Sequence, residues 1–182
     1  LSQGSCVGVT DVFDANAVLP TATNNGTVGA DTCDIPANTK AHIGVSDVFA
    51  TSCDGVEEVP AGVGDFQGPI QVMNFVVPKL ADASIQSISA EAAYLVFGFD
   101  PTTNDAATGK SYADGTPWTA KADIFMRGSG SGTQSMLGKA IGVPPGAWAL
   151  NNNAANALAS SALMVTAIGN ATNHDTTIGI LG

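Results

Sequence analysis

A small-residue junction between an apolar segment and a helical one most constrains what this chain can fold into. Ile124–Arg127 is apolar until it ends in arginine, and Gly128–Thr133 then reads Gly-Ser-Gly-Ser-Gly-Thr. Gln134–Ile141 follows with the spacing of a helix. Such a loop gathers backbone N–H groups at a helix N-terminus, where the helix dipole also favours negative charge. The junction therefore predicts a binding site for an anion.

Side chains at this junction strengthen the prediction. Arg127 would supply a planar and permanently charged donor, and the hydroxyls of Ser131 and Thr133 would donate hydrogen bonds. Other glycine-rich motifs do not fit. The glycine before Lys139 is one residue too far along for a P-loop, and the junction has neither the dinucleotide fingerprint nor the Gly-x-Ser-x-Gly elbow. A Gly-Ser loop without a ligand is the alternative interpretation.

Apolar periodicity along the rest of the chain predicts strands that alternate with helices. We expect strands at Ala41–Val45, Pro69–Val77, Asp123–Met126 and Thr176–Leu181, and the end of a strand at Leu1–Ser5. We expect helices at Val7–Val18, from Ser89 onward, at Gln134–Ile141 and over most of Asn151–Ile168. Polar loops are expected at Thr21–Asn38, Thr51–Gly68 and Asp100–Pro117. This order predicts an α/β fold with largely parallel strand pairing.

Charge and composition narrow the possible partners. The 182 residues carry a formal net charge of −10, with six Lys and Arg against sixteen Asp and Glu. Nucleic acid is therefore disfavoured as a partner, because phosphate backbones bind clustered cations. No apolar run approaches the roughly 18 residues that span a bilayer. Few lysines and many Ala, Gly, Thr, Asn and Ser indicate a periplasmic or secreted protein from which a leader has been removed.

The three cysteines, Cys6, Cys33 and Cys53, lie in the first third of the chain. None forms a Cys-x-x-Cys pair, which argues against a zinc ribbon or a thioredoxin-type site. One disulfide and one odd thiol are expected outside the cytoplasm, and three reduced cysteines are the alternative. The polar, turn-rich surroundings favour a disulfide between Cys33 and Cys53.

These motifs, in this order, resemble the phosphate-binding proteins of ABC transporters. That family carries Arg-x-Asp-Gly-Ser-Gly-Thr at a strand-to-helix junction, where this chain has Arg127–Thr133. Gly4–Val9 is similar to the family's Gly-Ser-Ser-Gly-Gly-Val, and Gly44–Asp47 is similar to its Gly-Ala-Ser-Asp. Met73–Pro78 resembles the strand that follows in the family. The similar segments cover most of the chain.

The resemblance implies a two-lobed periplasmic-binding-protein-like α/β fold, with mostly parallel sheets flanked by helices. Residues 1–73 would form a partial first lobe, and residues 74–182 most of the second lobe. Family members have further segments that would lie before Leu1 and after Gly182. We therefore expect an incomplete fold, in which another chain or a missing segment completes the first lobe.

The resemblance also implies which residues would bind an oxyanion. Ser5 would donate from its hydroxyl and backbone, and Asp47 would accept from Arg127 or from a protonated ligand. The remaining groups of the site would come from Arg127, Ser129, Ser131, Gly132 and Thr133.

One residue of the motif departs from the family. Ser129 stands where the family has a second Asp, which accepts the proton of a protonated phosphate and so rejects sulfate. The identity of the anion is therefore open, and phosphate is one of several candidates.

Three functions follow from these interpretations. The first is an extracytoplasmic protein that binds phosphate or a similar oxyanion for an ABC-type membrane component. It would close about a hinge near Asn74–Pro78 and would need no catalytic residue, metal or cofactor. The second is a structural or interaction protein that reuses the fold without a ligand in an extracellular assembly. The third, a phosphate-ester hydrolase, is disfavoured because the sequence has no cluster of metal ligands and no activated nucleophile.

Overall fold

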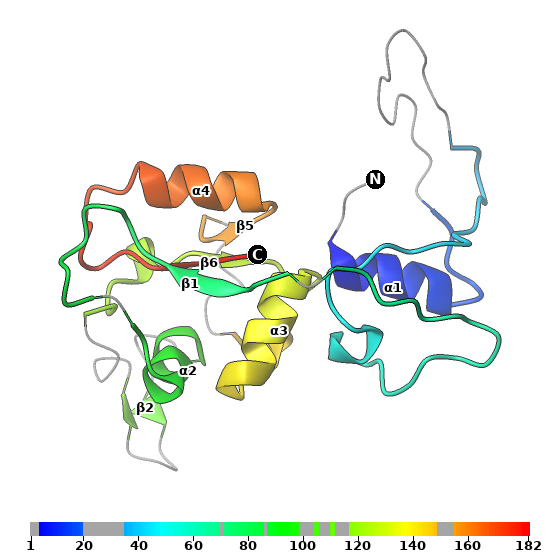
Figure 1. Ribbon diagram of the computed structural model, residues 1–182, viewed down its shortest axis with the longest axis horizontal. Coiled ribbons are helices and arrows are strands. Elements are labelled where there is room, and N and C mark those ends of the chain that lie inside the picture. Colours follow the sequence, from blue (N-terminus) through cyan, green and yellow to red (C-terminus); the bar gives the residue numbers. More distant parts are fainter. Residues whose placement is uncertain are drawn as a thin grey trace, which may run out of the picture.

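The computed structural model describes residues 4–19, 35–69, 71–85, 87–98, 104–105, 110–111, 117–148 and 155–182. Within these ranges the chain is a mixed α/β structure with four α-helices and short sheets (Figure 1). The α-helices are α1 (Ser5–Phe13), α2 (Ala90–Gly98), α3 (Gly132–Ile141) and α4 (Ser161–Gly169). Short 3-10 turns are η1 (Ala50–Ser52), η3 (Lys121–Asp123) and η4 (Pro145–Ala147). The strands are β1 (Asn74–Val76), β2 (Asn104–Asp105), β3 (Lys110–Ser111), β4 (Met126–Arg127), β5 (Ala157–Leu158) and β6 (Gly179–Leu181).

The strand pairing is mixed, which corrects the prediction of largely parallel sheets. β1 runs antiparallel to β6, β2 antiparallel to β3, and β4 parallel to β5. A parallel bridge between Ile124 and Ile178 brings β6 beside β4. In this bridge the Phe125 N–H donates to the Ile178 carbonyl at 2.8 Å. The strands β1, β6, β4 and β5 therefore lie next to one another in that order.

Helices cover both sides of these strands. In Figure 1, α4 lies on one side of β1 and β6, and α2 and α3 lie on the other. The buried side chains of this larger core come from α2, α3, α4, β4, β6 and the neighbouring loops, and side chains of β1 and β5 pack against them while partly exposed. The Phe97 ring stacks on Phe75 with ring centroids 5.4 Å apart, and it contacts Trp148 at 4.9 Å. The second half of the chain therefore has a continuous apolar core.

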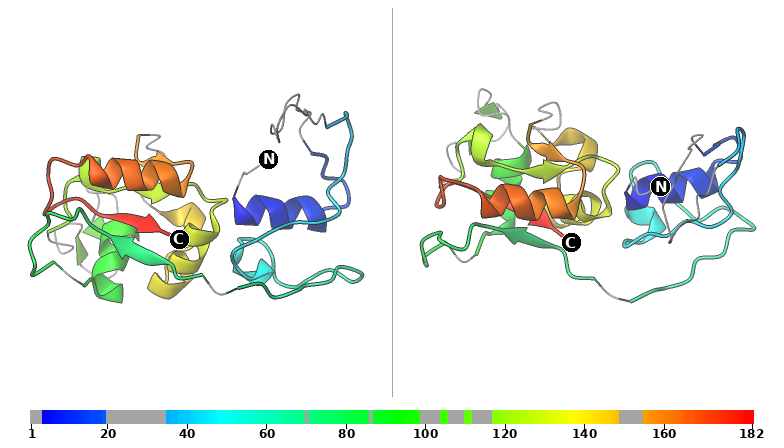
Figure 2. Two further views of the ribbon diagram at one scale, coloured as in Figure 1. Left: turned by 45° about the horizontal axis from the view of Figure 1, so that its top comes forward. Right: turned by 90° about the horizontal axis from the view of Figure 1, so that it is seen from above.

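A second, smaller cluster surrounds α1. Cys6, Val9 and Cys53 are buried there, and Phe13, Val48, Ala50 and Val56 pack against them. Figure 2 shows the segment after η1 running from this cluster toward β1. The prediction of two lobes that divide between residues 73 and 74 stays a prediction.

A disulfide joins Cys6 to Cys53, and the predicted pair of Cys33 with Cys53 is wrong. Cys6 lies in the first turn of α1, and Cys53 follows η1 directly, so their Cα atoms are 5.3 Å apart. This distance falls within the range that a disulfide requires. Cys33 lies outside the described residues.

Two helix starts agree closely with the sequence prediction. The Ser89 hydroxyl accepts from the Ala92 N–H at 3.1 Å, so it caps α2 as expected. The loop after Arg127 leads directly into α3, which begins at Gly132 rather than at Gln134. The predicted helix at Val7–Val18 is also present, but it starts at Ser5 and ends at Phe13.

Other predicted elements are absent or shorter. The Ala41–Val45 segment forms no strand, because its backbone packs on α1: a Cβ on Gly44 would lie 3.2 Å from Val12. Ser5 belongs to a helix rather than to the end of a strand. The Pro69–Val77 strand is reduced to β1, which is only partly buried.

The boundaries near the larger core also differ from prediction. The strand predicted at Asp123–Met126 is observed as β4, which begins only at Met126. Asp123 instead ends the 3-10 turn η3. The helix predicted over most of Asn151–Ile168 is α4 from Ser161 within the described residues, because Ala157–Leu158 pairs with β4 as strand β5. The predicted strand at Thr176–Leu181 is confirmed as β6, and most of the predicted loops at Thr21–Asn38 and Asp100–Pro117 lie outside the described residues.

We expect the disulfide to contribute substantially to stability. It closes a loop with a sequence separation of 47 residues around a cluster with few buried side chains. Replacing both Cys6 and Cys53 with serine should lower the free energy of unfolding by about 2–4 kcal/mol in a denaturant titration. Cys33→Ser is the matched control and should leave that energy unchanged. A larger loss in the control than in the double variant would contradict the Cys6–Cys53 pairing.

Candidate functional site

A cavity of about 680 Å³ opens where α1, the first turn of α3 and the first turn of α4 meet. All of the predicted oxyanion residues except Ser129 line this cavity. The lining residues among them are Ser5, Asp47, Arg127, Ser131, Gly132 and Thr133. Ser129 is exposed and is not among the residues that form the wall.

The starts of α1 and α3 are in direct backbone contact. The Cys6 N–H donates to the Gly130 carbonyl at 3.2 Å. Gly4 precedes α1 with φ of 98°, and a Cβ at this position would lie only 2.6 Å from the same carbonyl oxygen. Both the positive φ and the close approach require glycine here. Gly4 therefore allows two helix N-termini to lie at one cavity.

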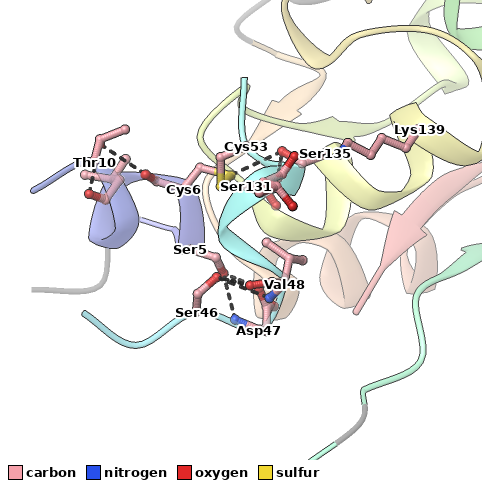
Figure 3. Close-up of a disulfide and its surroundings, with 12 residues drawn as sticks. Ser5, Cys6, Thr10, Ser46, Asp47, Val48, Cys53, Ser131, Ser135 and Lys139 are labelled. Atoms are coloured by element: carbon pink, nitrogen blue, oxygen red, sulfur yellow. Dashed lines mark hydrogen bonds between the residues drawn. A yellow bond between two sulfur atoms is a disulfide. The ribbon is translucent and has the colours of Figure 1, made fainter. Parts of the chain in front are cut away.

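Ser5 and Asp47 form a hydrogen-bonded pair beside the N-terminus of α3. The Ser5 hydroxyl donates to the Asp47 carboxylate and accepts from the Asp47 N–H at 3.4 Å. Figure 3 shows the two side chains pointing toward each other below the Cys6–Cys53 disulfide. Gly132 lies against this pair, since a Cβ on Gly132 would be 2.8 Å from the Ser5 oxygen. The missing side chain at Gly132 therefore lets the pair reach the helix N-terminus.

The first turn of α3 brings donors to the cavity. The N-terminal N–H groups of an α-helix have no partner within the helix. Ser131 is the N-cap residue but makes no capping hydrogen bond through its side chain. Ser131 and Thr133 are both buried and both line the cavity. Their hydroxyls and the backbone N–H groups of Gly132 and Thr133 are therefore the donors that a ligand would meet.

Arg127 is held at the cavity by three hydrogen bonds to the β5–α4 connection. Its Nε donates to the Leu158 carbonyl at 3.0 Å, and its Nη2 to the Ala159 carbonyl at 3.1 Å. Its Nη1 donates to the Ser161 hydroxyl, also at 3.1 Å. These bonds use one N–H of each nitrogen and fix the plane of the guanidinium. Among the described residues, the second N–H of Nη1 and of Nη2 is left for a ligand.

Arg127 and Asp47 interact through their charges and not through the hydrogen bond that the resemblance implied. Burial lowers the pKa of Arg127, and the negative charge of Asp47 raises it. The guanidinium remains charged at neutral pH, because its ordinary pKa is far above that range. Among the described residues, the carboxylate of Asp47 accepts from Ser5 instead. Asp47 therefore orients Ser5 while it partly balances the arginine.

Two serines at the start of α4 were not anticipated from the sequence. Ser160 and Ser161 both line the cavity. The Ser160 hydroxyl caps α4 by accepting from the Leu163 N–H at 3.2 Å. The Ser161 hydroxyl accepts from Arg127 and donates to the Gly182 carbonyl at 3.0 Å. A Ser-Ser pair before an apolar helical segment is an N-cap signal, which the prediction of a helix from Asn151 obscured.

The charges in the wall are balanced, and the described residues hold no metal site. Arg127 and Lys40 supply positive charge, and Asp11 and Asp47 supply negative charge. His42 also lines the cavity, whereas His174 lies in a separate surface hollow. Within the described ranges, no group of three or more His, Cys, Asp or Glu side chains could hold a metal ion. The arrangement can therefore bind an anion through N–H and O–H donors and one guanidinium.

Comparisons with known proteins identify no relative of this chain. No family model, no curated protein and no solved structure matches it. Within the part of the chain that the structure describes, no helix is both long enough and apolar enough to cross a membrane.

Proposed function

We propose that this chain is an extracytoplasmic solute-binding protein for phosphate or a similar oxyanion. One observation carries the proposal: two helix N-termini in backbone contact open onto a cavity that Arg127 also lines. Helix N-termini and fixed guanidinium groups are the protein groups best suited to a small multivalent anion. The resemblance to the phosphate-binding proteins of ABC transporters supports the same function from the sequence.

The groups that would hold the anion form what we call the oxyanion cradle: the backbone N–H of Ser5, whose hydroxyl donates to Asp47, together with Arg127, Ser131, Gly132 and Thr133. Arg127 would donate its two remaining N–H groups, and the first turn of α3 would donate from its backbone and hydroxyls. Each charge-assisted hydrogen bond contributes about 1.5–3 kcal/mol. The net charge of −10 does not oppose this strongly, since exposed charges are screened beyond about 10 Å at 0.1 M salt.

Asp47 is the carboxylate that would distinguish a protonated ligand from an unprotonated one. It lies beside Gly132 and lines the cavity, whereas Ser129 does not line it. A carboxylate accepts a hydrogen bond from a protonated phosphate oxygen but has nothing to accept from sulfate at neutral pH. The proposed site would therefore prefer phosphate to sulfate even without the family's second Asp.

The proposed partner is the membrane component of an ABC-type transporter. In this function the bound oxyanion would be delivered after a closure about the segment near Asn74–Pro78, which contains β1. The protein would perform no chemistry on its ligand.

A structural or interaction protein without a ligand is the second candidate. Phe66 is 92% exposed and Val72 is 67% exposed, and both belong to the segment that connects η1 to β1. In a function without a ligand, these side chains would contact the partner chain. Phosphate binding by the purified protein would separate the two candidates.

We expect isothermal titration with phosphate at neutral pH to detect binding, and Arg127→Ala to weaken it by at least about 100-fold. The variant removes the one guanidinium in the cradle and with it two charge-assisted hydrogen bonds to the anion. Each such bond contributes more than about 1.4 kcal/mol, which corresponds to a tenfold change in affinity. Lys79→Ala, which removes an exposed charge that does not line the cavity, is the matched control and should bind normally. Absence of binding by a folded wild-type chain would refute the proposal and favour the second candidate. Sulfate binding equal to that of phosphate would refute the role of Asp47.

We expect Ser161→Ala to weaken phosphate binding by about two- to tenfold. The variant removes the hydroxyl that accepts from Arg127, and a single such hydrogen bond contributes about 0.5–1.5 kcal/mol. Ser161→Thr keeps the hydroxyl and should restore most of the affinity. Thermal unfolding of both variants controls for a change in stability. Equal affinity of the alanine variant and the wild type would show that Ser161 does not position the guanidinium.

A further inference from the structure

Part of the cavity lining comes from α1 and from the segments that follow it in the sequence, and this part holds several apolar side chains. We call these side chains the apolar wall: Val7, Leu19, Ile35, Ile43 and Val45. Two of them are far more exposed than branched apolar side chains usually are. Ile43 is 85% exposed and Val45 is 88% exposed, although both line the cavity.

The backbone of α1 holds this segment in place. Gly44 packs on Gly8 of α1 so closely that a Cβ on Gly44 would also lie 3.2 Å from Val12. In turn, a Cβ on Gly8 would lie 3.3 Å from the Val45 carbonyl oxygen. The backbone of Gly44 therefore contacts the helix, and the side chains of its neighbours Ile43 and Val45 remain exposed. The same helix begins at Ser5, so α1 carries the cradle at one end and supports the apolar wall along its side.

Three polar residues, Asp11, Lys40 and His42, line the cavity beside the apolar wall. The Lys40 ammonium donates to the Ala15 carbonyl, which lies just beyond the end of α1. The cavity of about 680 Å³ lies within the roughly 300–1,000 Å³ range of pockets for small organic ligands. An inorganic oxyanion in the cradle would occupy a small part of it and would leave Ile43 and Val45 exposed.

We propose that the physiological ligand is an organic phosphate or phosphonate, whose oxyanion binds in the cradle and whose apolar body covers Ile43 and Val45. This inference rests on the proposed oxyanion-binding function and specifies its ligand class. The cradle satisfies the charge, and burial of the two exposed side chains supplies further affinity in proportion to the apolar area removed from water. A ligand with both parts matches both sides of the cavity.

The test compares three probes by isothermal titration with the full chain: inorganic phosphate, methylphosphonate and phenylphosphonate. The two phosphonates share a head group and differ in the size of the apolar body. We expect phenylphosphonate to bind about tenfold more tightly than methylphosphonate. The double variant Ile43→Ser/Val45→Ser should abolish that tenfold difference and leave phosphate affinity within about twofold of wild type.

The matched control is Leu163→Ser/Val165→Ser, which removes two exposed apolar side chains of α4 that do not line the cavity. It should keep the full preference for phenylphosphonate. The inference is overturned if phosphate and methylphosphonate bind but phenylphosphonate binds no more tightly. It is also overturned if the preference survives in the Ile43 and Val45 double variant. Failure of all three probes to bind a folded chain would instead refute the oxyanion function itself.

Discussion

The contact between the start of α1 and the loop before α3 organises the candidate site. The Gly130 carbonyl accepts from the Cys6 N–H, and Gly4 lies so close to it that no side chain fits. Because of this contact, segments more than a hundred residues apart in the sequence present their helix N-termini to the same space. Ser5, Asp47 and the first turn of α3 meet there as a result. Without this backbone contact, the cavity would lose one wall.

The two apolar clusters contribute differently to that contact. The core around Phe97 fixes α3, α4 and the end of β4, and thereby the position of Arg127. The smaller cluster buries few side chains among the described residues, and the Cys6–Cys53 disulfide adds a covalent link between α1 and the residue after η1. The disulfide is also adjacent to α3, since the Cys6 sulfur lies 3.3 Å from the Ser135 hydroxyl. The ammonium of Lys139 on α3 adds a hydrogen bond to the Thr51 carbonyl in η1.

Local chemistry made the helix starts predictable, and long-range packing made other features unpredictable. Ser89 predicts the start of α2, and the small residues after Arg127 predict the start of α3, because capping and loop geometry depend on nearby residues. Ala41–Val45 has the composition of a strand, but its partner is the surface of a helix distant in sequence. The pairing of Cys6 with Cys53 likewise depends on how α1 packs. The resemblance named six of the residues that line the cavity, whereas Ser160 and Ser161 required the position of β5.

The hydrogen bonds of Ser161 connect the cavity to the pairing of β1 with β6. Arg127 donates to the Ser161 hydroxyl, which donates in turn to the Gly182 carbonyl, and the neighbouring Leu181 is the partner of Asn74. The Arg127 guanidinium and the last residue after β6 therefore share one hydroxyl, so a shift of either group would alter the hydrogen bond that the other makes. The serine that orients the charge thereby also couples the cavity wall to the edge where β1 pairs with β6.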